Sequence, residues 1–209
     1  MTINKSREII NILKDYIKNP KPELDYNNNF ELLIAVTLSA QTKDQRVNIV
    51  TKELFKKYPD SYSLMNADIS ECINIINILG FAKNKAKNII EIARILSNEY
   101  NGNVPDKLED LMKLPGVGRK TALVVQALGF NIPAIPVDTH VIRVSNRLGY
   151  VKDENNPLVI EKVLKSKINK EDWILAHHLF LLFGRYHCKA INPLCDNCIL
   201  KEYCKSKKS

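Results

Sequence analysis

The sequence predicts an all-α fold, and three observations support that prediction. Apolar residues recur at helical spacing along nearly the whole chain, as in the stripe formed by Ala86, Ile89, Ile90, Ala93 and Leu96. Residues that begin or end helices stand at several of the expected boundaries. No segment has the apolar–polar alternation of a half-buried strand. We therefore expect roughly ten helices and no sheet.

Each expected helix is predicted from its own run of periodic apolar residues. In the second half of the chain, residues typical of helix ends strengthen the prediction. Asp106 with Glu109 indicates a capping box at the start of one helix. Gly129 and Gly149 follow two apolar helices, and Pro157 suits the first turn of another. In chain order, the expected helices cover residues 5–17, 30–39, 43–57, 69–78, 86–96, 106–113, 118–128, 139–148, 157–167 and 171–183.

Two irregular segments are candidate boundaries between lobes. Residues 19–29 are polar and rich in proline and asparagine. Residues 130–137 contain two prolines, so they cannot be helical throughout. A chain of 209 residues is long enough for two such lobes, and it should bury roughly 70% of its unfolded surface without disulfides.

The charge and hydropathy of the chain limit its partners. The formal net charge is +8 and the isoelectric point is near 9.2, which favours a polyanionic partner. The N-terminus has no uninterrupted apolar stretch of the kind found in signal peptides. The longest apolar stretch, Ile174 to Phe183, is too short to span a bilayer. We expect a soluble cytoplasmic protein without a membrane partner.

A glycine-rich turn, Leu114 to Ala122, is the most informative motif. It places Gly116 and Gly118 between two expected helices. Glycine allows the backbone to approach a ligand closely, and the amides at the start of the following helix favour an anion. Arg119 and Lys120 follow at once, so in a basic chain the indicated anion is a DNA phosphate. The alternative is an ordinary connection between two helices.

Four cysteines lie close together near the C-terminus: Cys188, Cys195, Cys198 and Cys204. In a reducing compartment two disulfides are a poor interpretation, so the set indicates a metal site. Zinc and an iron–sulfur cluster both accept four thiolates, and the unequal C-x6-C-x2-C-x5-C spacing favours the larger cluster. We expect the cluster to act as a structural staple. Cys72 stands apart and is expected to be a buried small apolar residue.

Together these motifs resemble the endonuclease III family of DNA glycosylases, which belongs to the helix-hairpin-helix superfamily. The resemblance extends from Leu32–Thr42, through the hairpin with Lys120 and the segment Val137-Asp-Thr-His140, to the four cysteines. It implies two helical lobes that flank a DNA cleft. One is a six-helix barrel with the helix-hairpin-helix, over residues 22–132. The other comprises residues 1–21 together with 133–209, and its four cysteines hold a [4Fe–4S] cluster.

The resemblance also implies an activity, namely base excision repair of oxidised pyrimidines in duplex DNA with abasic-site (AP) lyase activity. Lys120 would attack C1′ of the damaged nucleotide, hold the opened sugar as a Schiff base and permit β-elimination of the 3′ phosphate. Asp138 precedes an expected helix, where its default role is an N-cap. In the family the matching aspartate is catalytic, and both roles are compatible if one carboxylate oxygen faces the DNA.

The DNA contacts are also implied by the resemblance. The hairpin residues Gly116, Val117, Gly118 and Arg119 would hold the backbone, and Gln41 would fill the gap left by the flipped nucleotide. Phe81 would wedge the opposite strand at a position where the family usually has leucine; the alternative is a core residue. The first cluster loop is often richer in cations in the family, and here it offers only Lys189.

Two other functions fit the sequence less well. A monofunctional mismatch glycosylase of the same superfamily, acting on adenine or thymine, would lack a lysine at the position of Lys120. A non-catalytic helix-hairpin-helix module would need neither Lys120 nor Asp138. We therefore expect an enzyme that works as a monomer on damaged double-stranded DNA, in the cytoplasm and associated with the nucleoid.

Overall fold

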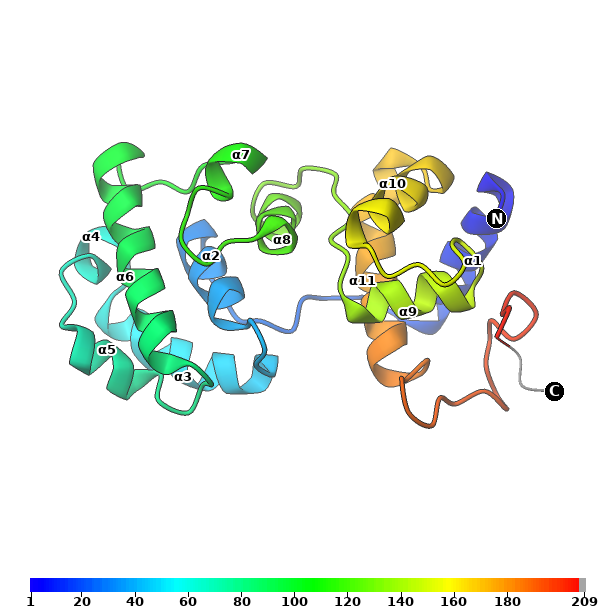
Figure 1. The fold of residues 1–209 in the computed structure, drawn as a ribbon, viewed down its shortest axis with the longest axis horizontal. Coiled ribbons are helices and arrows are strands. Elements are labelled where there is room, and N and C mark those ends of the chain that lie inside the picture. The colour runs from blue at the N-terminus through cyan, green and yellow to red at the C-terminus, as the bar shows by residue number, and fades with distance from the viewer. Residues whose placement is uncertain (207–209) are drawn as a thin grey trace. The chain divides into compact units, whose positions relative to one another are not determined.

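The computed structural model describes residues 1–206, and within them the chain is helical without any strand, as predicted (Figure 1). No helix in this range is both long and apolar enough to cross a bilayer. The elements are α1 (Ile3–Tyr16), α2 (Asn29–Leu38), α3 (Asp44–Lys57), α4 (Ser61–Leu64), α5 (Ile69–Ile75), α6 (Ala82–Glu99), α7 (Leu108–Leu111), α8 (Arg119–Gly129), α9 (Thr139–Arg147), α10 (Pro157–Lys167), the 3₁₀ helix η1 (Lys170–Asp172) and α11 (Trp173–Tyr186).

Packing divides the chain into two compact units. One unit is Pro22–Ile132, and the other combines Met1–Lys21 with Pro133–Ser209. The last three residues of the lobe expected from the sequence, 207–209, lie outside the described residues. Each unit has its own apolar core, and helix α1 joins the second core by packing on α11.

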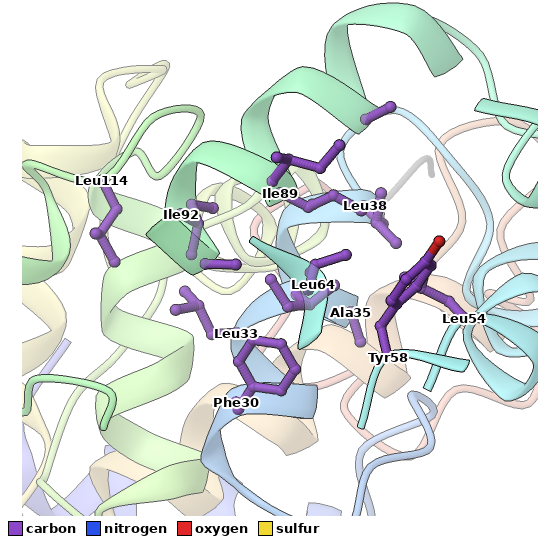
Figure 2. Close-up of a cluster of buried hydrophobic side chains, with 14 of the residues drawn as sticks. Phe30, Leu33, Ala35, Leu38, Leu54, Tyr58, Leu64, Ile89, Ile92 and Leu114 are labelled. Carbon is purple, nitrogen blue, oxygen red and sulfur yellow. The ribbon is translucent and has the colours of Figure 1, made fainter. Parts of the chain in front are cut away.

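The core of the 22–132 unit is built around α2. Every residue of this helix from Phe30 to Leu38 is buried, because the helix is apolar on nearly all sides and must be surrounded. Helices α3, α6 and α8 pack against it. Figure 2 shows Leu33, Ala35 and Leu38 of α2 among side chains contributed by the surrounding helices, such as Leu54 and Ile89.

The second unit depends on close packing of α9 against α11. Gly184 lies at their contact, where a Cβ atom would stand only 2.9 Å from Cβ of His140 and 3.2 Å from its carbonyl oxygen. Any side chain at Gly184 would therefore push the two helices apart. Phe180 and Phe183 fill the core beside this contact, and Leu200, from the segment that contains the cysteines, is fully buried in the same cluster.

The structure corrects two details of the predicted helices. The capping box at Asp106 is wrong, because α7 begins at Leu108 and has no side-chain cap at its N-terminus. Gln126 of α8 donates from Nε2 to the Asp106 carbonyl at 2.8 Å, which holds that residue outside the helix. Gly129 does not follow α8 but is its last residue. The short helix α4 was not predicted, since a single turn has no measurable apolar period.

Candidate functional site

The glycine-rich turn connects α7 to α8, and its two glycines have different roles. Gly116 has φ +78°, in the left-handed region that favours glycine, and a Cβ there would lie 2.6 Å from Nδ2 of Asn88. Gly118 is the N-cap of α8 with φ −84°, and a Cβ there would meet nothing within 4 Å. Between them, Val117 is 5% exposed and anchors the turn in the core. A side chain would therefore meet Asn88 at Gly116 but only open space at Gly118.

The open side of the turn is suited to an anion. The N-cap of α8 is Gly118, which offers no side-chain hydrogen bond to the amides of the first turn. Such amides, with the positive end of the helix dipole, bind phosphate oxygens well. Lys120 is exposed in this first turn, and the half-buried Arg119 precedes it. The arrangement places the Lys120 amine in the same helical turn as amides that are suited to an anion.

Asp138 begins α9 as its N-cap, as predicted from the sequence. Its Oδ1 atom accepts hydrogen bonds from the amides of His140 and Val141, both at 2.9 Å. No donor among the described residues bonds its other oxygen, Oδ2, and the residue is half-buried. His177 of α11 fixes the preceding segment, since its Nδ1 lies 2.8 Å from the Pro136 carbonyl and must donate to it. Asp138 therefore has one oxygen engaged and one available.

Gln41 and Phe81 both lie in the 22–132 unit, and both have left-handed backbones. Their φ angles are 56° and 61°, which cost energy for side chains other than glycine. Gln41 is exposed in the turn after α2, and Phe81 is the N-cap of α6 with 69% of its surface exposed. Phe81 is therefore not a core residue. A strained backbone under an exposed phenyl ring suggests a function outside the fold itself.

The four cysteines follow α11 and lie close to one another. Burial raises the pKa of Cys198 most, and the nearby thiols of Cys188, Cys204 and Cys195 raise it further. In residues 1–206 no three His, Cys, Asp or Glu side chains converge tightly enough to hold a single metal ion. Four thiolates are the ligand set that an iron–sulfur cluster requires.

Two arginines that the sequence analysis did not single out hold the first of these cysteines. Arg143 donates from Nε to the Cys188 carbonyl at 2.8 Å and from Nη2 to the Gly184 carbonyl at 2.7 Å. Arg147 donates from Nη1 to the Lys189 carbonyl at 2.8 Å and to Sγ of Cys188 at 3.3 Å. A cationic donor to sulfur stabilises the thiolate form that a cluster needs. Their four-residue spacing on one helix was the available signal.

Two further residues named in the sequence analysis are Lys189, a predicted DNA contact, and Cys72, the cysteine that stands apart from the other four. Lys189 is exposed directly after Cys188, and its ammonium has no ion pair within the described part of the chain. Cys72 is fully buried in α5, and burial raises the pKa of its thiol to about 11, which makes it inert. Lys120 and Gln41 belong to the 22–132 unit, whereas Asp138 and Lys189 belong to the other unit.

Family comparisons agree with these features. The family of HhH-GPD superfamily base excision DNA repair proteins matches residues 34–170, which contain the hairpin, Lys120 and Asp138. The iron–sulfur binding domain of endonuclease III matches residues 188–204, a range that begins at Cys188 and ends at Cys204. The fold and the site therefore define a base excision DNA repair protein with an iron–sulfur domain.

Individual relatives narrow the class. The chain is 46% identical to the endonuclease III of Bacillus subtilis (strain 168) over 91% of its own length and 87% of the relative's, and 40% identical to that of Escherichia coli (strain K12) over 98% of both. A solved structure of a trapped endonuclease III–DNA covalent intermediate superimposes with a TM-score of 0.93 at 45% identity, covering 98% of this chain and 96% of that one. The chain belongs to the endonuclease III family.

Membership of this family confirms the predicted class of enzyme. The protein is a base excision repair DNA glycosylase with AP lyase activity, and it binds DNA. Its iron–sulfur group is a [4Fe–4S] cluster.

The two glycines of the hairpin offer a matched pair of substitutions. Gly116→Ala should lower the free energy of unfolding by about 1–2 kcal/mol, because alanine resists the left-handed backbone. Gly118→Ala should lower the free energy of unfolding less than Gly116→Ala does, because only the N-cap preference for glycine over alanine is lost, but it should weaken binding to a DNA duplex, since its methyl group would project into the space a phosphate needs. Urea titration and fluorescence anisotropy measure the two effects. Equal destabilisation by both substitutions would contradict this division of roles.

Arg147 should support the cluster. Arg147→Met removes the donor to Cys188 Sγ and the Lys189 carbonyl, so we expect iron to be lost to a chelator about tenfold faster or more. The decay of visible absorbance and the iron content per chain measure this loss. Arg94→Met is the control, because Arg94 pairs with Glu91 in the other unit. Equal rates of iron loss in both variants would show that Arg147 does not hold the cluster.

Proposed function

We propose that the protein removes oxidised pyrimidines from duplex DNA and then cleaves the strand 3′ to the abasic site through a Schiff base on Lys120. The observation that supports this proposal is the position of Lys120. Its exposed amine stands in the first turn of α8, beside amides suited to a DNA phosphate. A lysine that only bound phosphate would not need a second catalytic group, and Asp138 has a carboxylate oxygen available.

The proposed chemistry begins at the sugar. The neutral Lys120 amine attacks C1′ as the C1′–N bond to the damaged base breaks, and the base leaves with the bonding electrons and takes up a proton. The ring oxygen is then released, and the sugar is held to Nζ as a Schiff base. This iminium acidifies the C2′ hydrogen, whose removal expels the 3′ phosphate. Water hydrolyses the Schiff base and regenerates the amine.

Asp138 contributes a charge to this reaction. Because Oδ1 is occupied by two backbone amides, the carboxylate is fixed in orientation without losing its negative charge. We assign Oδ2 to the stabilisation of positive charge at C1′ and to the acceptance of a proton from Lys120. The cap and the catalytic role then use different oxygens of one group.

The remaining residues hold and open the duplex. Gly116, Val117, Gly118 and Arg119 would bind a phosphate at the hairpin, and Lys189 would bind a second one. Gln41 would fill the space of the extruded nucleotide, and Phe81 would stack into the opposite strand. Unstacking a base costs a few kcal/mol, and an exposed phenyl ring offsets part of that cost by replacing the lost stacking. We propose that the protein acts as a monomer, in the cytoplasm at the nucleoid.

The cluster would be held by Cys188, Cys195, Cys198 and Cys204, and we assign it a structural role. Bound iron would replace the missing regular structure of this segment by linking its four thiolates. Buried Leu200 and the two arginines of α9 attach the same segment to the core. Lys189 would thereby be presented to DNA from a fixed loop.

The nucleophile can be identified by trapping. With a thymine-glycol duplex, sodium borohydride should reduce the Schiff base and yield a covalent protein–DNA adduct, visible by gel electrophoresis. Lys120→Gln should abolish the adduct because it lacks the amine. Lys162→Gln, an exposed lysine on α10, is the control and should trap normally. An adduct that persists in Lys120→Gln would assign the nucleophile elsewhere, and no adduct in the unaltered protein would favour a monofunctional glycosylase.

The role of Asp138 can be separated from its cap. Asn is as good an N-cap as Asp, so Asp138→Asn keeps the hydrogen bonds to His140 and Val141 but removes the charge. We expect single-turnover base removal to slow by at least about a hundredfold, whereas DNA affinity and thermal stability change little. Equal losses in base removal and DNA binding would return Asp138 to a purely structural role.

A further inference from the structure

Lys85, one turn into α6, is a buried lysine that the proposed chemistry does not use. Only 7% of its surface is exposed, and its Nζ donates to the hydroxyl of Thr42 at 2.7 Å. No acidic side chain in the described residues pairs with it, and burial lowers the pKa of its ammonium. Burying an ammonium group against a neutral hydroxyl is unfavourable for folding, so the arrangement requires an explanation other than stability.

Each partner lies close to a residue with a left-handed backbone, Thr42 beside Gln41 and Lys85 one helical turn after Phe81. Thr42 directly follows Gln41 in the turn between α2 and α3, and its amide donates to the Ser39 carbonyl at 3.0 Å. Lys85 lies four residues after Phe81, and its amide donates to the Phe81 carbonyl at 3.0 Å, closing the first turn of α6. The Lys85–Thr42 bond therefore connects the residue after Gln41 to the helical turn that begins at Phe81.

This bond joins segments far apart in the sequence. Its ends are 43 residues apart, and in Figure 1 α2 and α6 belong to the same group of helices. Around the bond the chain is polar and exposed: Gln41, Lys43 and Lys83 all lie on the surface. Among the described residues it is the one side-chain hydrogen bond that links the 39–43 turn to α6.

We propose that Lys85 is a positioning residue that locks the Gln41 turn to the Phe81 turn, so that both side chains enter the duplex in one fixed arrangement. The inference rests on the proposed roles of Gln41 and Phe81. A flipped nucleotide leaves a gap in one strand and an unpaired base in the other, and filling both at once requires a fixed separation between the two inserted groups. If the turn at Gln41 were flexible, inserting Gln41 into the duplex would order it, and the lost conformational entropy would weaken binding.

Two single substitutions and their combination test the lock. Lys85→Met removes the donor and keeps an apolar stem, and Thr42→Val removes the hydroxyl with little change in shape. Each should reduce base extrusion by about tenfold, the value expected for a hydrogen bond to a charged group. The readouts are 2-aminopurine fluorescence in a duplex with a tetrahydrofuran site and single-turnover excision of thymine glycol. The double variant should show the same reduction in base extrusion as either single variant, because each of the three variants lacks the Lys85–Thr42 hydrogen bond.

Matched control variants distinguish the loss of the Lys85–Thr42 hydrogen bond from a general loss of folding or DNA binding. Lys87→Met changes an exposed lysine that is also on α6, and this variant should extrude the nucleotide as well as the unaltered protein does. Thr42→Ser keeps the hydroxyl and should restore the behaviour of the unaltered protein. Lys85→Met should not lower the free energy of unfolding, since it removes a buried charge. Fluorescence and excision at the unaltered level in both Lys85→Met and Thr42→Val, or losses that multiply in the double variant, would overturn the proposal.

The test also distinguishes this inference from the function on which it rests. Gln41→Ala and Phe81→Ala should each reduce the 2-aminopurine signal. If they do not, the proposed insertion of these side chains fails, whatever Lys85 does. If they do, and Lys85→Met extrudes normally, only the positioning role of Lys85 fails.

Discussion

The burial of α2 is the constraint on which the 22–132 unit depends. Because this helix is apolar on nearly every side, α3, α6 and α8 must surround it, and each of them begins at a segment of functional interest. The turn with Gln41 lies between α2 and α3, Phe81 is the N-cap of α6, and α8 directly follows the hairpin. The side chains expected to meet DNA in this unit are thus positioned by helices that share one buried partner. Loss of packing at α2 would disturb all three segments together.

Helix α9 has a comparable role in the second unit. Its N-terminus is capped by Asp138, and its later turns carry the two arginines that hold the Cys188 segment. Gly184 brings α11 close to α9, so the carbonyl of Gly184 lies within reach of Arg143. The proposed catalytic carboxylate and the cluster segment are therefore anchored to one short helix. The cysteine segment lies outside the proposed chemistry, yet a displacement of this segment would remove the contacts that Arg143 and Arg147 make with Cys188 and Lys189.

Features determined by local sequence were predictable, and features determined by distant contacts were not. The helical period, the Asp138 cap, Pro157 in a first turn and the left-handed Gly149 all follow from residues within one turn of each other. The start of α7 was predicted wrongly, because a bond from Gln126, 20 residues away, holds Asp106 outside the helix. The contacts of Lys85 with Thr42 and of Arg147 with Cys188 span 43 and 41 residues. Lysine and arginine side chains are usually exposed, and although the spacing of Arg143 and Arg147 places both on one face of a helix, the sequence does not show which distant residues they contact.

Phe81 has a thermodynamic consequence for the unbound protein. Its left-handed backbone and its largely solvated ring both raise the free energy of the folded chain relative to a glycine or asparagine at the same place. Insertion between bases would bury the ring and leave the backbone as it is. The folded protein is thus less stable than it would be with glycine or asparagine at position 81, and under the proposed role of Phe81 this cost provides an exposed aromatic ring for the duplex. Selection for heat resistance and selection for repair would favour different residues at this one position.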